Sequence, residues 1–229
     1  MAADQDLSEL YGSKPLSYYG NPRVDYVDML PDNRSLRILE IGCGNGATGV
    51  LALQRNKCVE YVGIEMFKSE GKKAEQVLSK VYIGNVETMT FPFPPDYFDV
   101  LIASEVLEHL TDPYDVVKRA CVWVKPGGRV FASSPNISWF GNIVSLIRGR
   151  FDYAEEGMMD RTHLRWFTPS SFAEMFESAG VKIDRLAPLS EVSGKNARRK
   201  KLVSLFFGKR FDHLWWYQIN MHGTKACVP

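Results

Sequence analysis

The sequence predicts an α/β fold, a doubly wound and mostly parallel sheet of seven strands with helices on both faces and a cap inserted after the fifth strand. Short apolar runs alternate with helix-compatible stretches along the chain, which is typical of such sheets. A glycine-dense turn, residues 42–46, follows the first apolar run and precedes a helical stretch. A second apolar run ends on a carboxylate, Glu65. This layout is typical of a nucleotide pocket at the carboxyl edge of a parallel sheet.

The individual elements follow from the same patterns. Helical spacing over residues 23–30 stops at Pro31, because proline interrupts a helix. Apolar runs predict the strands and helical spacing predicts the later helices: strands at 37–41, 60–65, 81–83, 98–104, 129–133, 181–186 and 214–226, and helices at 47–54, 68–78, 114–124 and 171–179. Lys125-Pro126-Gly127-Gly128 predicts a turn before the fifth strand. Right-handed crossovers between parallel strands then give a Rossmann-like architecture.

The length of the chain suits one domain, residues 1–229. Residues 1–30 form a polar lead-in, in which Tyr18 and Tyr19 could cover the ligand at the end of the first strand. Residues 136–168 interrupt the alternation with mixed aromatic, cationic and polar residues that follow no helical or strand period. Because loops after the strands of an open sheet face the ligand crevice, this insertion is the predicted acceptor pocket and lid.

Composition limits the classes of partner and the compartment. A net charge of +1 provides no overall attraction for nucleic acid or for membranes, so such contacts would have to be local. No cationic leader and no apolar run long enough to span a bilayer is present, which predicts a cytoplasmic protein. The four cysteines are widely spaced without a Cys-x-x-Cys pair, which favours reduced thiols over disulfides or zinc ligands.

The glycine turn by itself fits two ligand classes. Gly42-x-Gly44-x-x-Ala47 also satisfies the dinucleotide fingerprint of nicotinamide-dependent oxidoreductases. Glu40 favours a different ligand, since a carboxylate at this point would repel a diphosphate and attract a cationic amino-acid portion or a sulfonium. Gly46 adds a third small residue, where the loop can wrap around a compact ligand.

The segment Leu39-Glu40-Ile41-Gly42-Cys43-Gly44-Asn45-Gly46 resembles the first motif of the class I S-adenosylmethionine-dependent methyltransferases. The stretch 98–104 is similar to the fourth strand of that family, and Gly84-Asn85-Val86-Glu87 to the segment after its third strand. Many relatives have aspartate where this chain has Asn85, whose carbonyl can still accept a hydrogen bond from the amine of adenine. The resemblance covers residues 37–134 and implies S-adenosyl-L-methionine as the methyl donor.

The resemblance also implies which residues contact the donor. The glycines of the turn would contact its methionine portion, Glu65 its ribose and Met66 its adenine. The complete implied set is Glu40, Gly42, Cys43, Gly44, Gly46, Glu65, Met66, Asn85, Val86, Ser104 and Glu105.

Histidines are the candidates for a catalytic base, since the unperturbed pKa of imidazole lies near neutrality. His109 follows the fourth strand directly, beside the expected methyl group, and His163 lies in the insertion. Both are predicted to be catalytic if the acceptor is an aliphatic hydroxyl, whose proton must be removed. His213 and His222 lie at or within the last predicted strand, where a structural role is favoured.

A divalent cation is an alternative use of the same region. Glu105, Glu108 and His109 would share one face if they were helical, and His163 could complete a ligand set. This Glu-x-x-Glu-His pattern resembles metal-dependent O-methyltransferases of ubiquinone synthesis and of small-RNA 2′-O-methylation. The similar sequence Glu-Val-Leu-Glu-His-Leu also occurs in family members with no known metal, so both interpretations stay open.

The second half of the chain more loosely resembles bacterial methyltransferases of glycan and surface-polysaccharide synthesis, through residues 148–151 and 160–168. This resemblance implies a small-molecule or sugar hydroxyl as acceptor and makes nucleic acid a less favoured partner. N- or C-methylation, an RNA acceptor, a nicotinamide-dependent oxidoreductase and a binding module without catalysis are the alternatives.

One further segment is strongly basic. Residues 195–210 contain seven cationic residues and no acidic one, around an apolar centre at 202–207. Such a segment can contact an anionic membrane surface or RNA phosphates, or it can be a solvated connector.

Overall fold

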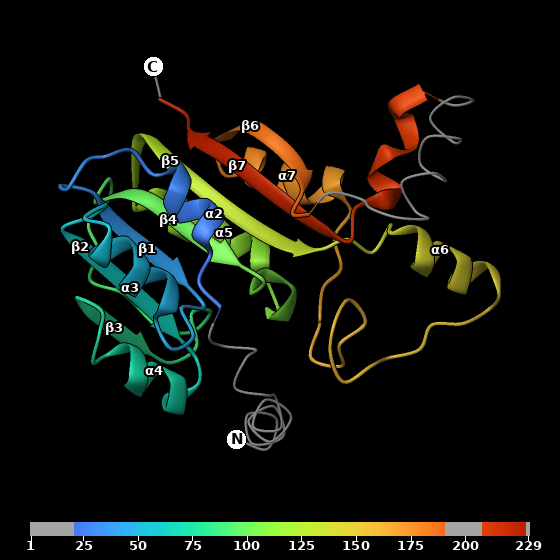
Figure 1. The fold of residues 1–229 in the computed structure, drawn as a ribbon, viewed down its shortest axis with the longest axis horizontal. Coiled ribbons are helices and arrows are strands. Elements are labelled where there is room, and N and C mark those ends of the chain that lie inside the picture. Colours follow the sequence, from blue (N-terminus) through green and yellow to red (C-terminus); the bar gives the residue numbers. More distant parts are fainter. Residues whose placement is uncertain (1–20, 191–207, 228–229) are drawn as a thin grey trace.

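The computed structural model describes residues 21–190 and 208–227 and contains one mixed sheet (Figure 1). The order of its strands is β3-β2-β1-β4-β5-β7-β6. The strand bounds are β1 Arg37–Ile41, β2 Glu60–Glu65, β3 Lys80–Ile83, β4 Phe98–Ser104, β5 Val124–Pro135, β6 Val181–Pro188 and β7 Gln218–Lys225. The predicted α/β fold with a mostly parallel seven-stranded sheet is confirmed.

The strand directions place the ligand crevice. Strands β1 to β5 pair in parallel, whereas β7 runs antiparallel to both of its neighbours. The chain moves outward from β1 through β2 to β3 and then returns to the other side of β1 with β4. This reversal is the switch point beside which open α/β sheets bind ligands, so the carboxyl ends of β1, β2 and β4 form the mouth of the site.

Helices cover both faces of the sheet, as Figure 1 shows for α3 in front of it and α7 behind it. Their bounds are α2 Val24–Met29, α3 Ala47–Gln54, α4 Lys68–Ala74, α5 Pro113–Val122, α6 Phe140–Ile147 and α7 Pro169–Ser178, with 3-10 turns η2 Leu107–His109 and η3 Gly208–Trp215. One buried cluster joins Tyr26 of α2 to Phe131 of β5, and the other joins Phe176 of α7 to Leu101 of β4. Burial on both faces explains why the central strands are continuous apolar runs.

Two helices begin at caps that are visible in the sequence. The Asp112 carboxylate accepts a hydrogen bond of 3.1 Å from the Asp115 amide at the start of α5. Thr168 and Ser171 form a reciprocal capping box on α7. In both helices proline occupies the first turn, where its missing N–H has no intrahelical partner. These local signals explain why both helices lie close to their predicted positions.

Four predicted elements differ from the structure. The helix expected at 68–78 ends at Ala74, and Leu78 instead packs over Gly49 and Gly63. Strand β5 begins before the expected turn at 125–128, because Val124 already pairs with Phe98 of β4. The expected turn is an irregularity in the pairing inside the strand. The insertion contains the helix α6, which was not expected, and residues 208–215 form η3 before the last strand.

Some predictions lie outside the described residues. These are the lid role of residues 1–20, with Tyr18 and Tyr19, and most of the basic segment 195–210, of which 195–207 is not described. Among the described residues, no helix has the length and apolar character needed to cross a bilayer.

We expect Gly63→Ala to destabilise the fold by about 1–3 kcal/mol, because a Cβ there would lie 2.4 Å from the Cys43 sulfur in a close-packed interior. Denaturant unfolding of the two proteins measures this difference. The double variant Cys43→Ala/Gly63→Ala should be less destabilised than the sum of the two single changes, since the sulfur is gone. A neutral Gly63→Ala would contradict this description of the packing.

Candidate functional site

The glycine turn between β1 and α3 is built from backbone that other residues rarely adopt. Gly42, Gly44 and Gly46 have φ angles of 74°, 53° and 86°. At Gly42 a Cβ would also lie 2.8 Å from the Val106 side chain. Two consecutive amides of the turn, those of Gly42 and Cys43, donate to the Ile64 carbonyl. The turn is therefore folded against the end of β2, in a conformation that requires glycine.

Glu65 connects this turn to the next strand end. Its two carboxylate oxygens accept hydrogen bonds of 2.8 Å, one from the Gly44 amide and one from the Phe67 amide. The side chain is only 5% exposed. Burial raises the pKa of Glu65, and the backbone hydrogen bonds act against that rise. Backbone amides thus hold a buried carboxylate at the mouth. Neither of these two hydrogen bonds comes from a cationic side chain.

Glu40 is a second buried carboxylate beneath the turn. It accepts a hydrogen bond of 2.7 Å from the Tyr61 hydroxyl. Burial, opposed by hydrogen bonds from Tyr61 and Thr48, raises the pKa of Glu40 to about 7. A cation bound nearby would favour its ionised form.

The segment after β3 lies beside Glu65. The Gly84 amide donates to the Glu65 carbonyl over 2.8 Å. The Asn85 side-chain carbonyl accepts from the Glu87 amide at 2.8 Å, so one of its two lone pairs is already used by this local turn. Val86 is buried, while Met66 at the end of β2 is 39% exposed. These residues form one side of the mouth.

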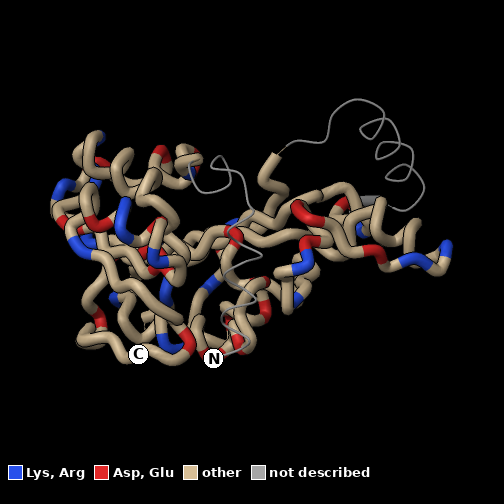
Figure 2. Tube along the Cα trace, turned by 90° about the horizontal axis from the view of Figure 1, so that it is seen from below, with Lys and Arg blue, Asp and Glu red and all other residues tan. Residues whose placement is uncertain are grey.

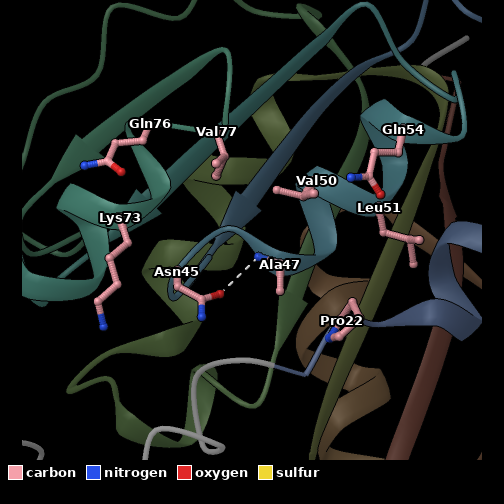
Figure 3. Close-up of a pocket in the computed structure, with 9 residues that line it drawn as sticks. All are labelled: Pro22, Asn45, Ala47, Val50, Leu51, Gln54, Lys73, Gln76 and Val77. Carbon is pink, nitrogen blue, oxygen red and sulfur yellow. Dashed lines mark hydrogen bonds between the residues drawn. The ribbon is translucent and has the colours of Figure 1, made fainter.

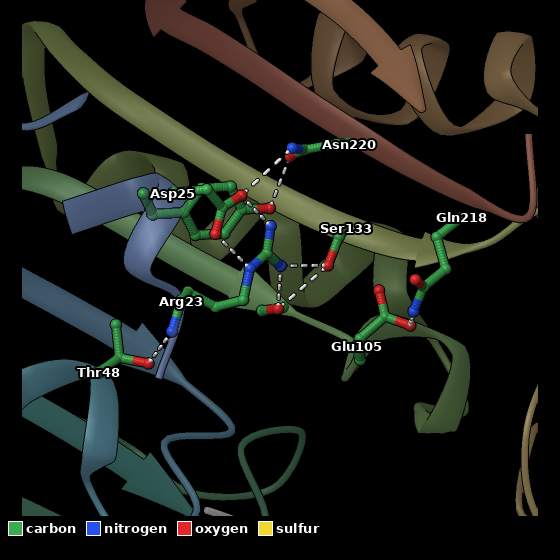
Figure 4. A network of polar contacts seen from close by, with 9 residues as sticks. Arg23, Asp25, Thr48, Glu105, Ser133, Gln218 and Asn220 are labelled. Carbon is green, nitrogen blue, oxygen red and sulfur yellow. Dashed lines mark hydrogen bonds and ion pairs between the residues drawn. The ribbon is translucent and has the colours of Figure 1, made fainter. Parts of the chain in front are cut away.

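Arg23 is a site residue that the sequence analysis did not identify. Its guanidinium donates to the hydroxyls of Ser104 and Ser133, at the carboxyl ends of β4 and β5, and pairs with Asp25 at 2.7 Å (Figure 4). It also stacks 3.6 Å from the centre of the Tyr26 ring. The signal in the sequence was a lone arginine at the first position of a predicted helix, and helical spacing alone does not tell whether such a residue faces water or the sheet.

Glu105 follows β4 in an unfavourable backbone conformation, with φ of 50°. One of its carboxylate oxygens accepts a hydrogen bond of 2.8 Å from Gln218 of β7, as Figure 4 shows. The other oxygen is buried and has no hydrogen-bond partner within the described residues. Backbone strain at a partly buried polar residue is typical of functional positions.

Glu105, Glu108 and His109 do not lie on one helix and so share no helical face. The Glu105 amide bonds to the Ser133 carbonyl of β5 instead of starting a helix, and only Leu107–His109 form a short 3-10 turn. His163 nevertheless lies beside this turn. The possible ligand atoms of Glu108, His109 and His163 all fall within 4.8 Å of one another. The structure therefore brings three of the four predicted residues together, with Glu105 outside the group.

Backbone contacts orient the two imidazoles of this group. His109 Nδ1 lies 3.1 Å from the Thr162 carbonyl, and His163 Nδ1 lies 3.0 Å from the Met158 carbonyl. Because a carbonyl only accepts, Nδ1 carries the hydrogen in each neutral ring and the lone pair is on Nε2. Burial, together with the nearby Glu105, raises the pKa of Glu108. Such a set can accept a proton or hold a cation with nitrogen and oxygen ligands.

The two remaining histidines lie apart from this group. His222 of β7 is buried in edge-to-face contact with Tyr26 and Phe131. The backbone carbonyl of His213 in η3 accepts a hydrogen bond of 2.8 Å from the Asn136 side chain. Both positions agree with structural roles.

A groove of about 510 Å³ flanks the glycine turn between α3 and α4, where Figure 3 shows Asn45, Val50 and Lys73 along its sides. Neither Glu65 nor Glu40 lines it. The groove thus adjoins the mouth described above but is a separate surface.

The residues present fit a ligand with a positive centre and an adenosyl group. Three glycines with positive φ shape the turn, and the buried carboxylates of Glu40 and Glu65 lie beside it. A model of the methyltransferase domain family matches residues 22–186. The chain belongs to this family. It is an S-adenosylmethionine-dependent methyltransferase, as the sequence predicted.

Known proteins similar to this methyltransferase agree with that assignment. The ubiquinone biosynthesis O-methyltransferase of Aeromonas salmonicida is 30% identical over 188 residues, which cover 77% of this chain and 78% of that protein. The enzyme of the same name from Saccharophagus degradans is 25% identical over 182 residues, covering 77% and 76%. A solved structure of a SAM-dependent methyltransferase from Archaeoglobus fulgidus has the same fold, with a TM-score of 0.62, 17% identity and coverage of 88% and 90%.

We expect the stability of the ligand-free methyltransferase to fall as the pH rises from about 4.5 to about 7, in part through Glu40. The folded state binds the Glu40 proton more tightly than the unfolded chain does, so this contribution is complete below the unfolded pKa and is lost as the pH rises through the folded one. Urea unfolding across this range should show a smaller slope for Glu40→Gln. The exposed Glu75→Gln serves as control and should keep the original slope. An unchanged slope in Glu40→Gln would contradict the assigned pKa.

Proposed function

We propose that this methyltransferase transfers a methyl group to a hydroxyl of a small molecule. The observation that carries the proposal is the group of Glu108, His109 and His163 after β4, where two imidazoles and a carboxylate are available to remove a hydroxyl proton. The similar proteins from Aeromonas salmonicida and Saccharophagus degradans are ubiquinone biosynthesis O-methyltransferases, which supports the same reaction class.

The donor would be held along the mouth by the predicted residues. The backbone of Gly42, Cys43, Gly44 and Gly46 would contact its amino-acid portion, and Glu65 would accept hydrogen bonds from its ribose hydroxyls. The adenine would lie between Met66 and the segment with Asn85 and Val86, while Glu40, Ser104 and Glu105 would complete the site near the amino-acid portion. S-Adenosylmethionine supplies an electrophilic methyl group on a sulfonium.

Charge provides a reason for this arrangement. Glu40, Glu65 and one oxygen of Glu105 are withdrawn from water, and a positively charged ligand offsets the cost of that burial. Arg23 is the complementary group, since its guanidinium could bind the carboxylate of an amino-acid portion. Alignment of acceptor and donor by such contacts can lower a barrier by roughly 7–11 kcal/mol.

His109 and His163 would act at Nε2, the atom that carries the lone pair in the neutral ring. Either imidazole could take the hydroxyl proton of the acceptor. As an alternative, Glu108, His109 and His163 could hold a divalent cation, which would lower the pKa of a bound hydroxyl. The two uses are distinguished by chelation.

The insertion offers a place for the acceptor. Phe151, Tyr153 and Trp166 form a cluster with ring centroids 5.6 to 6.2 Å apart. Phe151 and Tyr153 are about half exposed. Such rings can stack against an aromatic acceptor or against the apolar face of a sugar, so phenolic and sugar hydroxyls are both included in the proposed class.

We expect Glu65→Gln to bind S-adenosylhomocysteine at least about tenfold more weakly than the original protein, because each hydrogen bond to a charged group contributes about 1.5–3 kcal/mol. Isothermal titration calorimetry measures this change. Glu75→Gln, an exposed change of the same chemistry, is the matched control and should bind normally. The assigned site would be refuted if Glu65→Gln bound S-adenosylhomocysteine as tightly as the original protein. Tight binding of NAD in place of S-adenosylhomocysteine would refute it as well.

We expect His109→Ala or His163→Ala to lower kcat by about 10²–10⁴ if the missing ring is the base, with donor affinity unchanged. The assay follows methyl transfer to a panel of phenols, catechols and sugars by mass spectrometry. If chelation abolishes turnover and added divalent ion restores it, the group binds a metal. If turnover is complete after chelation, the group acts as a general base without a metal. Unchanged kcat in both variants would exclude both roles.

A further inference from the structure

A row of small polar side chains crosses the sheet at the carboxyl ends of β4 and β5. Ser104 pairs with Ser133 in the β4–β5 register, and Ser133 pairs with Asn220 in the β5–β7 register. Residues opposite one another in neighbouring strands point to the same face of a sheet, so the three side chains form one row. Ser133 and Asn220 are buried. Buried hydroxyl and amide groups need hydrogen-bond partners, because leaving them unpaired costs free energy.

The partners of this row come from the ion pair of Arg23 and Asp25 and from Tyr26 (Figure 4). Nη1 of Arg23 donates to both serine hydroxyls. The side-chain amide of Asn220 donates to Asp25 over 3.4 Å, and its carbonyl accepts a hydrogen bond of 2.9 Å from Tyr26. The guanidinium in turn lies 3.6 Å from the centre of the Tyr26 ring. The four residues Arg23, Asp25, Asn220 and Tyr26 therefore form a closed ring of contacts.

The guanidinium of Arg23 has five N–H groups, and four of them are used by Asp25 and the two serines. Nε and one hydrogen of Nη2 are donated to the two oxygens of Asp25, over 2.9 and 2.7 Å. Within the described part of the chain, the second hydrogen of Nη2 has no partner. A carboxylate is a fitting ligand for this group, because it accepts hydrogen bonds and matches the positive charge.

Arg23 also lies where the amino-acid portion of the methyl donor is proposed to bind. Its amide donates to the Thr48 hydroxyl over 3.3 Å, which connects it to α3 directly after the glycine turn. Its side chain, which is only 13% exposed, reaches from there to the ends of β4 and β5, as Figure 4 shows. Figure 2 shows acidic and basic residues mixed over the sheet and its helices. A carboxylate would therefore be selected by this single cation rather than by a broad charged face.

A second carboxylate near Arg23 shows why the position of the guanidinium has to be controlled. Glu105 has one oxygen without a hydrogen-bond partner among the described residues. Burial raises the pKa of Glu105, while hydrogen bonds and the positive charge of Arg23 act against that rise. The two side chains are thus close enough to attract each other, yet Arg23 pairs with Asp25 instead. A direct pair with Glu105 would use the charge that a bound carboxylate needs, and Asp25 prevents it.

We propose that Asp25 and Asn220 are positioning residues that hold Arg23 ready to bind the carboxylate of the methyl donor. Asp25 orients the guanidinium through two hydrogen bonds, and Asn220 fixes Asp25 from β7. The site then selects nucleosides that carry an α-amino acid over nucleosides without one. This inference rests on the proposed function, in which Arg23 meets the amino-acid portion of S-adenosylmethionine.

The test compares two ligands by isothermal titration calorimetry of the full-length protein. S-Adenosylhomocysteine carries the amino-acid portion, whereas 5′-methylthioadenosine has the adenosyl group and the sulfur without it. We expect Asp25→Asn to bind S-adenosylhomocysteine at least about fivefold more weakly, because the released guanidinium would pair with Glu105. Its affinity for 5′-methylthioadenosine should stay within about twofold of that of the original protein. Asn220→Leu should act in the same way by a smaller factor.

Asp28→Asn is the matched control. Asp28 lies on the same helix as Asp25 and also pairs with an arginine, Arg55, which caps the carboxyl end of α3 away from the glycine turn. This variant should leave both affinities unchanged. The comparison of two ligands separates positioning from folding, because a general loss of stability would weaken the binding of both.

The inference would be overturned by equal weakening of both ligands in Asp25→Asn, or by an unchanged or higher affinity of this variant for S-adenosylhomocysteine. An equal loss in Asp28→Asn would overturn it too. If the original protein bound the two ligands equally well, the donor site would stand and only the contact with the carboxylate would be refuted. If it bound neither ligand, the proposed donor site would be refuted as well.

Discussion

The contact on which the site depends is the pair of hydrogen bonds that the Glu65 carboxylate accepts from backbone amides, one in the glycine turn and one at the start of α4. Through it, the end of β2 determines the shape of the turn after β1. The turn can adopt this shape because its glycines tolerate positive φ. Close packing continues beneath it, where the Cys43 side chain lies against Gly63. A small change in either strand would therefore be transmitted to the mouth of the site.

The charge balance at this edge of the sheet is unusual for a stable interior. Glu40, Glu65 and Glu108 are all buried, and burial raises the pKa of each. Arg23 partly compensates, since it reaches from the start of α2 to the ends of β4 and β5. Withdrawing acidic groups from water costs stability that an apolar core would not lose. A cationic donor bound at the proposed site would offset this cost.

The insertion between β5 and α7 is held at its two ends and projects between them. At its start, the buried Asn136 side chain donates to the backbone carbonyls of His213 and Trp216. Near its end, the amides of Leu164 and Arg165 donate to the Glu108 carbonyl, which brings His163 beside His109. The same segment thus completes the group after β4 and carries α6 away from it. The proposed acceptor region is therefore connected directly to the group after β4.

Local signals were sufficient for much of the fold. Strands β1, β2 and β4 have the predicted bounds, because buried parallel strands are short apolar runs that end at turns. The grouping of His109 with His163 was also predicted, since loops after neighbouring strands meet at one edge. Glu105, Glu108 and His109 share no helical face, because the Glu105 amide bonds to β5 instead of starting a helix. The predicted donor contacts and catalytic roles stay proposals, as does the division of the chain into lead-in, core and insertion.

The sequence alone determined the sheet, the glycine turn and the carboxylate that follows β2, because these depend on short-range pattern. Its motifs also carried the resemblance to the methyltransferase family. Only the tertiary structure decided that Arg23 reaches the ends of β4 and β5, that Glu105 lies outside the group of Glu108, His109 and His163, and that no residue of α6 is buried within the described part of the chain. The physical reason is that these features depend on which surfaces remain exposed after distant segments pack, and spacing along the chain does not contain that information.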